Sequence, residues 1–171
     1  MKYPIYWPQY FTATILEWKH LLKQDKCKDI IVDSLRFLVA DGRIELNAFV
    51  IMNNHIHLIW QPLGDWTPEK IQHSLMSFTA HKFKNHLQEN HEQFLQQFKV
   101  DAKDRKYQFW ERNPLGIDLV NEQMFLQKFN YIHQNPVVKG LCLLPEDYYY
   151  SSAKFYELGI DDFGMLTHFK G

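Results

Sequence analysis

The sequence predicts an α+β fold, a sandwich in which helices pack on a largely antiparallel sheet. Two kinds of segment occur along the chain. Some have the alternating or continuous apolar pattern of strands, and others repeat apolar residues every three to four positions, as helices do. Their order is β-α-β-β-α-β-β-α. Strands that follow one another through short turns pair antiparallel, so this order favours a single layered sheet with packed helices.

The first half of the chain supplies three strands and one helix. Ile31, Leu35 and Leu38 have helical spacing, and Asp41-Gly42 then ends that helix. Asn53-Asn54 is suited to a tight turn between two strands. The expected elements are, in chain order, a strand over residues 10–15, a helix over 28–40, and strands over 43–52 and 55–61.

The second half is expected to be richer in helix. Pro68 suits the first turn of a long helix, and residues 88–106 indicate a helix end followed by a loop. Pro136 is expected to end a later helix, and Ser151 to cap the last one. The expected elements are a helix over 68–87, short strands over 107–110 and 117–120, and helices over 122–134 and 151–157.

The strand over residues 55–61 is predicted to lie inside the sheet. Ile56 and Leu58 are apolar on one face, and Ile51 and Ile59 are expected to cover the face that carries two histidines. A strand that is covered on both faces is expected to be central.

Length and composition indicate one domain that spans residues 1–171, with residues 157–171 as a C-terminal tail of unknown role. Apolar residues make up 46% of the chain and aromatic residues 16%. Some aromatic side chains could therefore stack on nucleic-acid bases as well as fill the core.

The charge balance and the cysteine content exclude several classes of protein. With 19 basic and 20 acidic residues, the chain is not suited to binding long duplex DNA by bulk electrostatics, although a local basic groove is compatible with it. Cys27 and Cys142 show no zinc-site or disulfide spacing. Residues 1–7 lack the apolar core of a signal peptide, and no apolar run is long enough to span a membrane. We expect a cytoplasmic protein.

Two histidines provide the first candidate for chemistry. His55 and His57 lie two positions apart on an expected strand, so both side chains project from the same face. Two imidazoles at that spacing can share one metal ion. Taken alone, the pair suits hydrogen-bonded histidines of the core or the surface better than a metal site.

A tyrosine and an asparagine provide the second candidate. Tyr131 and Asn135 lie four positions apart on an expected helix and therefore share a face. A free tyrosine has a pKa of about 10, and a nearby cation favours its nucleophilic phenolate form. Taken alone, Tyr131 could be a core residue and Asn135 a helix cap before Pro136.

The two motifs together resemble a known family. Segment 52–58, with His55-Ile56-His57, is similar to the His-hydrophobic-His signature of the single-tyrosine HUH transposases, which comprise insertion-sequence enzymes and REP-associated tyrosine transposases. Segment 128–141 resembles the catalytic-helix signature of that family, and segment 145–153 its downstream pattern. The resemblance covers about residues 5–156. Asn53 departs from it, since the family usually has proline there.

The resemblance implies a ferredoxin-like core and a specific chemistry. His55, His57 and Asn135 would bind Mg²⁺ or Mn²⁺, and Asn135 as third ligand is closer to the REP-associated branch. The metal would polarise the scissile phosphate, and Tyr131 would attack it to leave a 5′-phosphotyrosine. The implied activity is that of a single-stranded DNA transposase with endonuclease activity, which cleaves and rejoins hairpin ends.

The implied partner is single-stranded DNA, folded into a hairpin. His81, Lys82 and Lys84 are candidate contacts to its backbone, with a solvated helix face as the equal alternative. Four aromatic residues could stack on bases but suit structural roles better: Trp66, Trp110, Tyr148 and Tyr149.

Several alternatives stay open. A domesticated REP-type nickase would use the same chemistry, and a catalytically idle single-stranded DNA-binding module would not need the full set of site residues. The active protein could be a monomer or a homodimer that exchanges its catalytic helix.

Overall fold

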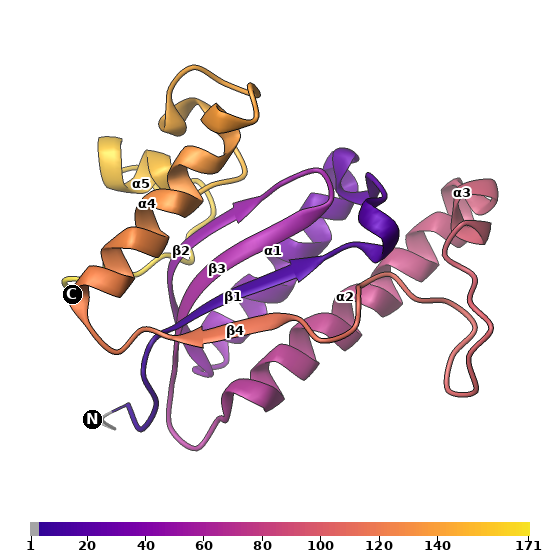
Figure 1. Ribbon diagram of the computed structural model, residues 1–171, viewed down its shortest axis with the longest axis horizontal. Helices are drawn as coiled ribbons and strands as arrows, with labels where there is room; N and C mark the ends of the chain where they lie inside the picture. The colour runs from indigo at the N-terminus through magenta and orange to yellow at the C-terminus, as the bar shows by residue number, and fades with distance from the viewer. Residues whose placement is uncertain (1–3) are drawn as a thin grey trace.

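A computed structural model describes residues 4–171 of the chain (Figure 1). The expected absence of a signal peptide concerns residues 1–7, of which residues 1–3 lie outside this range. The elements are β1 (Gln9–Thr14), the short 3₁₀ turns η1 (Leu16–Trp18) and η2 (Leu21–Lys23), α1 (Asp25–Ala40), β2 (Ile44–Ile51), β3 (His55–Pro62), α2 (Pro68–Asn90), α3 (Glu92–Gln96), β4 (Leu115–Asp118), α4 (Glu122–Val138), η3 (Pro145–Asp147) and α5 (Ala153–Leu158).

The four strands form one antiparallel sheet in the order β2-β3-β1-β4. The turn at Asn53-Asn54 is closed by the N–H of Met52, which donates to the carbonyl oxygen of His55 at 2.9 Å. β3 lies between β1 and β2, and every residue of it is buried. The predicted α+β class and the central position of this strand are confirmed.

The sheet separates two layers of helices (Figure 1). Helices α1 and α2 pack against each other and on one face, where Phe11, Leu58 and Trp60 belong to the main core. Helix α4 packs on the opposite face, over Tyr10 and Ile59. This second face also carries the two histidines, so the site lies between the sheet and α4.

The expectation that Ile51 covers the histidine face is wrong. Ile51 pairs with Ile56 across the β2–β3 hairpin, and directly paired residues project from the same face. Ile51 therefore belongs to the core under α1 and α2. Ile59 lies on the histidine face as predicted, and Val50 and Met52 take the place expected for Ile51.

The C-terminal segment, expected as a tail of unknown role, packs along the outer edge of β2. Ser151 forms an antiparallel bridge with Val50, and Leu166 forms a parallel bridge with Leu46. The carboxylate of Asp161 accepts four backbone N–H groups, those of Phe163, Gly164, Met165 and Leu166. The segment thereby covers an edge that would otherwise leave hydrogen-bonding groups exposed.

Three expected elements differ from the structure. Residues 107–110 form isolated bridges rather than a strand, because Phe109 and Trp110 are drawn into the core against α2. The last strand is β4 at Leu115–Asp118, two residues earlier than expected. Residues 88–106 begin with the expected helix end, the last residues of α2, but the expected loop after it contains the short helix α3.

Helix α4 continues past Pro136, which was expected to end it. Proline removes one backbone donor from the helix, but the burial of Ile132, His133 and Pro136 holds the turn together. The helix ends at Val138 with Lys139 as its C-cap, and Gly140 follows with a φ of 73°, the left-handed conformation that glycine adopts readily. The N–H of Leu141 donates to the carbonyl of Pro136, as in a Schellman cap.

None of the helices within residues 4–171 combines the length and the hydropathy that a membrane crossing requires.

Candidate functional site

The candidate site is centred on two histidines that β3 presents to α4. His57 lies opposite Thr12 of β1 and Val50 of β2, and His55 lies opposite Thr14. The side chains are therefore neighbours on one face, with ring centroids 4.8 Å apart. Both residues are buried, at 9% exposure for His55 and 5% for His57.

Hydrogen bonds to the Nδ1 atoms orient both imidazoles. Nδ1 of His55 donates to Oδ1 of Asn54 at 2.7 Å, because an amide oxygen can only accept. Nδ1 of His57 lies 2.8 Å from the hydroxyl of Tyr10 and 2.9 Å from that of Thr12. A protonated Nδ1 leaves the Nε2 lone pair available, which is the arrangement of metal-ligating histidines.

Helix α4 supplies the phenol and the amide. Asn121 begins the helix by accepting the N–H of Met124 at 2.8 Å, and Tyr131 and Asn135 follow on one face. Nδ2 of Asn135 donates to Nε2 of His57 at 3.3 Å. The ring centroid of Tyr131 lies 5.3 Å from that of His57. Strand and helix thus bring the four predicted site residues together.

The amide oxygen of Asn135 has no hydrogen-bond partner among the described residues, although it is buried. A buried acceptor without a partner is costly, and such groups occur where a ligand, an ion or a water belongs. Asn135 is 6% exposed, whereas Tyr131 is 51% exposed. The amide therefore faces the interior of the site, and the phenol stands at its open side, where a large substrate can approach.

Burial keeps the site histidines neutral. Desolvation lowers the pKa of His57 to about 3, with further contributions from His55 and Lys128. Desolvation and the charge of Lys139 lower the pKa of His55 to about 4. Both rings are therefore neutral at neutral pH, with a proton on only one of the two nitrogens, and the neutral ring is the form that binds a metal. The two lysines place positive charge close to the site, where a phosphate would be attracted.

A polar contact fixes α4 on the sheet beside the site. Nε2 of His133 lies 2.7 Å from the hydroxyl of Ser152, which also accepts the N–H of Phe49 at 2.9 Å. These three groups are fully or almost fully buried. Helix α4 is therefore joined to β2 and to the start of α5 within the same chain.

The predicted DNA contacts lie elsewhere. His81, Lys82 and Lys84 are exposed on α2, which packs on the opposite face of the sheet from α4. Lys82 lies over the ring of Phe78, with Nζ 5.5 Å from its centroid. The structure does not bring these residues together with the histidines.

The four candidate base stackers differ in their surroundings. Trp110 is buried and donates its indole N–H to Thr79 at 3.0 Å, and Tyr148 donates its hydroxyl to the carbonyl of Ile51 at 2.6 Å. Trp110 and Tyr148 therefore have structural roles, which were the alternative to base stacking. Trp66 stacks on Arg43, whose guanidinium carbon lies 4.1 Å from the ring centroid, while Tyr149 is exposed.

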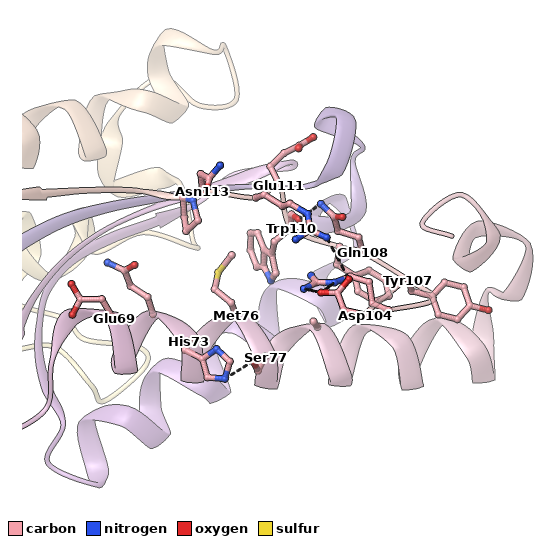
Figure 2. A pocket seen from close by; sticks show the side chains of 16 residues that line it. Glu69, His73, Met76, Ser77, Asp104, Tyr107, Gln108, Trp110, Glu111 and Asn113 are labelled. Carbon is pink, nitrogen blue, oxygen red and sulfur yellow. Dashed lines mark hydrogen bonds and ion pairs between the residues drawn. The ribbon is translucent and has the colours of Figure 1, made fainter. Parts of the chain in front are cut away.

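A cavity of about 650 Å³ lies between α2 and the segment 104–114 (Figure 2). Trp110 and Met76 project into it from its two walls, and His73 and Ser77 contact each other on the helix. Asp104 pairs with Arg105 at 2.8 Å and with Arg112 at 3.5 Å. The cavity contains none of the predicted site residues.

Sequence analysis did not identify the residues that support the site. Tyr10 and Thr12 contact His57 because β1 pairs with β3, and Lys128 lies one helical turn before Tyr131. The apolar alternation of residues 10–15 was visible, but the register that places Thr12 opposite His57 was not. His133 could have been noticed as the polar member of a buried helix face.

Comparison with known proteins establishes the family. Residues 10–110 match the family model described as "Transposase IS200 like", so the chain belongs to the IS200-like transposase family. The match includes His55 and His57 and ends before Tyr131 and Asn135. The resemblance to single-tyrosine transposases is thereby confirmed at the level of the family. No curated protein matches the chain.

Solved structures support the fold. A REP-associated tyrosine transposase bound to a REP hairpin superposes with a TM-score of 0.68 and 18% identity, over 95% of this chain and 87% of that chain. A candidate transposase from Deinococcus radiodurans gives a TM-score of 0.49 and 18% identity, over 75% of this chain and 90% of that chain. At this identity, the first structure shows that the fold is shared.

Proposed function

We propose that this transposase cleaves and rejoins single-stranded DNA hairpin ends through Tyr131, with a divalent metal bound beside it. The observation that carries the proposal is the convergence of an exposed phenol, two buried neutral imidazoles and a buried amide oxygen on one face of the sheet. The buried Asn135 oxygen has no hydrogen-bond partner among the described residues and lies next to two neutral imidazoles, which supports a metal ion at this place. We further propose that residues 1–171 act as one domain, in the cytoplasm.

His55, His57 and Asn135 would hold Mg²⁺ or Mn²⁺. Among the described residues, no group of three or more His, Cys, Asp or Glu side chains could hold a metal ion, and the proposed site would take its third ligand from the Asn135 amide. Imidazole nitrogens and an amide oxygen suit borderline to hard cations. When bound, the ion supplies Lewis-acid polarisation of the scissile phosphate. Rotation of the Asn135 amide would turn its partnerless oxygen toward the two Nε2 atoms.

Tyr131 would perform the covalent step. Its phenolic oxygen forms a bond to phosphorus while the bond from phosphorus to the 3′ oxygen breaks. The phenol loses its proton to solvent, and the leaving 3′ oxygen takes one up. The product is a 5′-phosphotyrosine and a free 3′-hydroxyl. Because the phosphodiester is conserved in the covalent bond, a second 3′-hydroxyl can reverse the step and rejoin the strand without ATP.

The proposed substrate is a hairpin with a single-stranded flank. The structural neighbour with the same fold is bound to a REP hairpin, and the fold similarity makes a hairpin the first substrate to test. Lys128 and Lys139 lie near the histidines and could contact phosphates at the site. We also propose that His81, Lys82 and Lys84 contact the part of the DNA, either the hairpin duplex or its single-stranded flank, that extends to the α2 face.

Covalent capture tests the proposal. The protein is incubated with a library of single-stranded DNA hairpins in Mn²⁺ or in EDTA, and protein joined to DNA is separated under denaturing conditions. We expect an adduct in Mn²⁺ only, and no adduct from His57→Ala. The exposed His73→Ala serves as the matched control and should react like the wild type. Tight hairpin binding without any adduct would contradict the proposal and favour an idle binding module.

Reaction products distinguish the remaining alternatives. A transposase rejoins the cleaved strand to a second 3′-hydroxyl, whereas a nickase of the same chemistry only releases or reseals its own product. Hairpin repeats that flank the gene would support an element-associated transposase, and hairpins scattered far from it the REP-type role.

A further inference from the structure

A second, smaller cavity of about 280 Å³ opens next to His55. Three segments that are distant in the sequence line it: the η1 turn and the residues after it, the β2–β3 turn, and the residues that follow α4. Its polar and aromatic lining consists of Trp18, His20, Asn53, Asn54, His55 and Lys139. The cavity therefore adjoins the proposed metal site without containing Tyr131.

Trp18 forms one wall of this cavity in an unusual backbone conformation. Glu17 has a φ of 53° and Trp18 a φ of 57°, so two consecutive residues with side chains occupy the left-handed region. Such residues are strained, and strain of this kind persists where neighbouring contacts hold it and often has a functional reason. Neither residue is a glycine, which would adopt this conformation without strain.

Three hydrogen bonds keep the turn in place. The N–H of Glu17 donates to Oε1 of Glu111 at 2.6 Å, and the N–H of Trp18 donates to the carbonyl of Ile15 at 2.9 Å. Nδ2 of Asn54 donates to the carbonyl of Trp18 at 3.3 Å. Because Asn54 also orients His55, one side chain links the tryptophan turn to the candidate site.

The strained turn presents the indole to solvent rather than to the core. Trp18 is 61% exposed, and its ring meets the ring of His55 edge-on at 6.0 Å between centroids. A large aromatic side chain gains little from packing in such a position. An exposed indole face is, however, a good platform for stacking a nucleic-acid base, whichever base it is.

The other lining groups fit a nucleotide. Lys139 places a positive charge at the rim, where a backbone phosphate can pair with it. His20 and Asn53 offer hydrogen-bonding groups for a base edge. An apolar ligand would leave these polar groups unsatisfied, and a second protein would need a broader surface than one small cavity.

We propose that this cavity binds one unstacked base of the single-stranded DNA, immediately next to the phosphate that Tyr131 attacks. The base stacks on the indole of Trp18, and Lys139 contacts its phosphate. The pocket would hold the strand in register with the metal site and so determine which phosphate is cleaved. This inference rests on the proposed function, since it places the base relative to the reacting phosphate.

A binding measurement in EDTA tests the pocket separately from the reaction. The probe is a short fluorescein-labelled oligothymidylate, and the readout is its fluorescence anisotropy. We expect Trp18→Ala to weaken binding by between about 5-fold and 150-fold, the range for loss of one stacked base. Trp18→Phe should restore most of the affinity. Trp7→Ala removes an equally exposed tryptophan before β1 and should bind like the wild type.

Trp18→Gly separates binding from folding. Glycine adopts a positive φ without strain, so this variant should melt at a higher temperature than Trp18→Ala. Both variants lack the indole, and both should bind the probe equally weakly. If binding instead followed the melting temperature across the three variants, or if Trp18→Ala bound like the wild type, the base pocket would be refuted.

The two proposals fail in different ways. Wild-type protein that forms the covalent adduct while Trp18→Ala binds and reacts normally would refute the pocket and leave the transposase reaction intact. A loss of probe binding in Trp18→Ala, combined with no adduct in the wild type, would support the pocket and refute the reaction.

Discussion

The side-chain amide of Asn135 lies 3.3 Å from Nε2 of His57, although 78 positions separate the two residues in the chain. One belongs to the central strand of the sheet and the other to the helix that covers it. The same chain therefore supplies both halves of the candidate site. A protein that exchanged α4 with a partner would have to break the contact of His133 with Ser152 as well.

Removal of the amide should weaken metal binding. We expect Asn135→Ala to lower the Mn²⁺ affinity by at least about tenfold, since loss even of an outer partner of a metal site costs about 10–100-fold. Isothermal titration with Mn²⁺ measures this. Gln134→Ala, on the exposed side of the same helix, is the matched control and should titrate like the wild type. Equal affinities in the two variants would exclude Asn135 as a ligand.

The hydroxyl groups beside Nδ1 of His57 should also contribute to metal binding. Thr12→Val keeps the shape of the side chain but removes one of the two hydroxyls beside Nδ1. We expect a loss of about 10-fold or more in Mn²⁺ affinity with little change in the far-ultraviolet spectrum. Thr14→Val, two residues along the same strand, provides the comparison. An unchanged affinity would show that Tyr10 alone orients the ring.

The contact between α4 and the C-terminal segment should be important for stability. Ser152→Ala leaves the N–H of Phe49 and Nε2 of His133 buried without their partner. We expect a loss of about 1–3 kcal/mol in the free energy of unfolding, measured in urea. Ser77→Ala, which removes an exposed hydroxyl on α2, should change it by less than about 0.5 kcal/mol. If Ser152→Ala also changed the free energy of unfolding by less than about 0.5 kcal/mol, the proposed role of this contact in stability would be refuted.

The C-terminal segment offers a second stability test. Asp161 accepts four backbone N–H groups, whereas the neighbouring Asp162 forms an ion pair with Lys154 at 2.8 Å. Asp161→Ala should therefore cost about 1–3 kcal/mol, and Asp162→Ala less than about 1 kcal/mol. The melting temperature of Asp161→Ala should therefore be lower than that of Asp162→Ala. Equal melting temperatures would mean that the segment contributes little to the fold.

Acid should destabilise the metal-free protein in a defined window. The folded-state pKa values of His55, His57 and His133 are about 4, 3 and 4, below the value of about 6.5 in the unfolded chain. Below pH 6.5 the unfolded chain therefore binds more protons than the folded one. The stability that is present above pH 6.5 should fall, by roughly 1 kcal/mol per pH unit for each histidine. Urea denaturation in EDTA between pH 7 and pH 5 measures this, and a flat profile would contradict the buried, neutral state.

The sequence pattern predicted the parts of the site that depend on local geometry. The two-residue period of a strand placed His55 and His57 on one face of the sheet, and the helical period placed Tyr131 and Asn135 on one face of their helix. The apolar flanks of residues 55–61 correctly indicated an interior strand. These features follow from backbone geometry within a single element, so no knowledge of the tertiary fold was needed.

The remaining features depend on contacts between distant segments. Thr12 supports His57 only through the strand register, and the role of Asp161 follows from the path of the chain after α5. Helix α4 passes Pro136 because tertiary burial outweighs the local preference of proline. Trp18 was not among the residues predicted for the site, since its exposure results from a positive φ that no sequence pattern indicates.

The phenol of Tyr131 should be dispensable for folding. Tyr131→Phe keeps the ring, which is half exposed, and removes only the attacking oxygen. We expect unchanged hairpin affinity, a melting temperature close to that of the wild type, and no covalent adduct in Mn²⁺. Tyr149→Phe is the matched control, because Tyr149 is also about half exposed and lies outside the site. It should form the adduct at the wild-type rate.

Identification of the residue that carries the DNA tests the central claim most directly. The adduct of the wild-type protein with a cleaved hairpin is digested with a protease, and the DNA-linked peptide is sequenced by mass spectrometry. The account predicts a phosphodiester on Tyr131, in the helix that also carries Asn135. DNA attached to any other residue, or to another tyrosine in the Tyr131→Phe variant at the wild-type level, would contradict it.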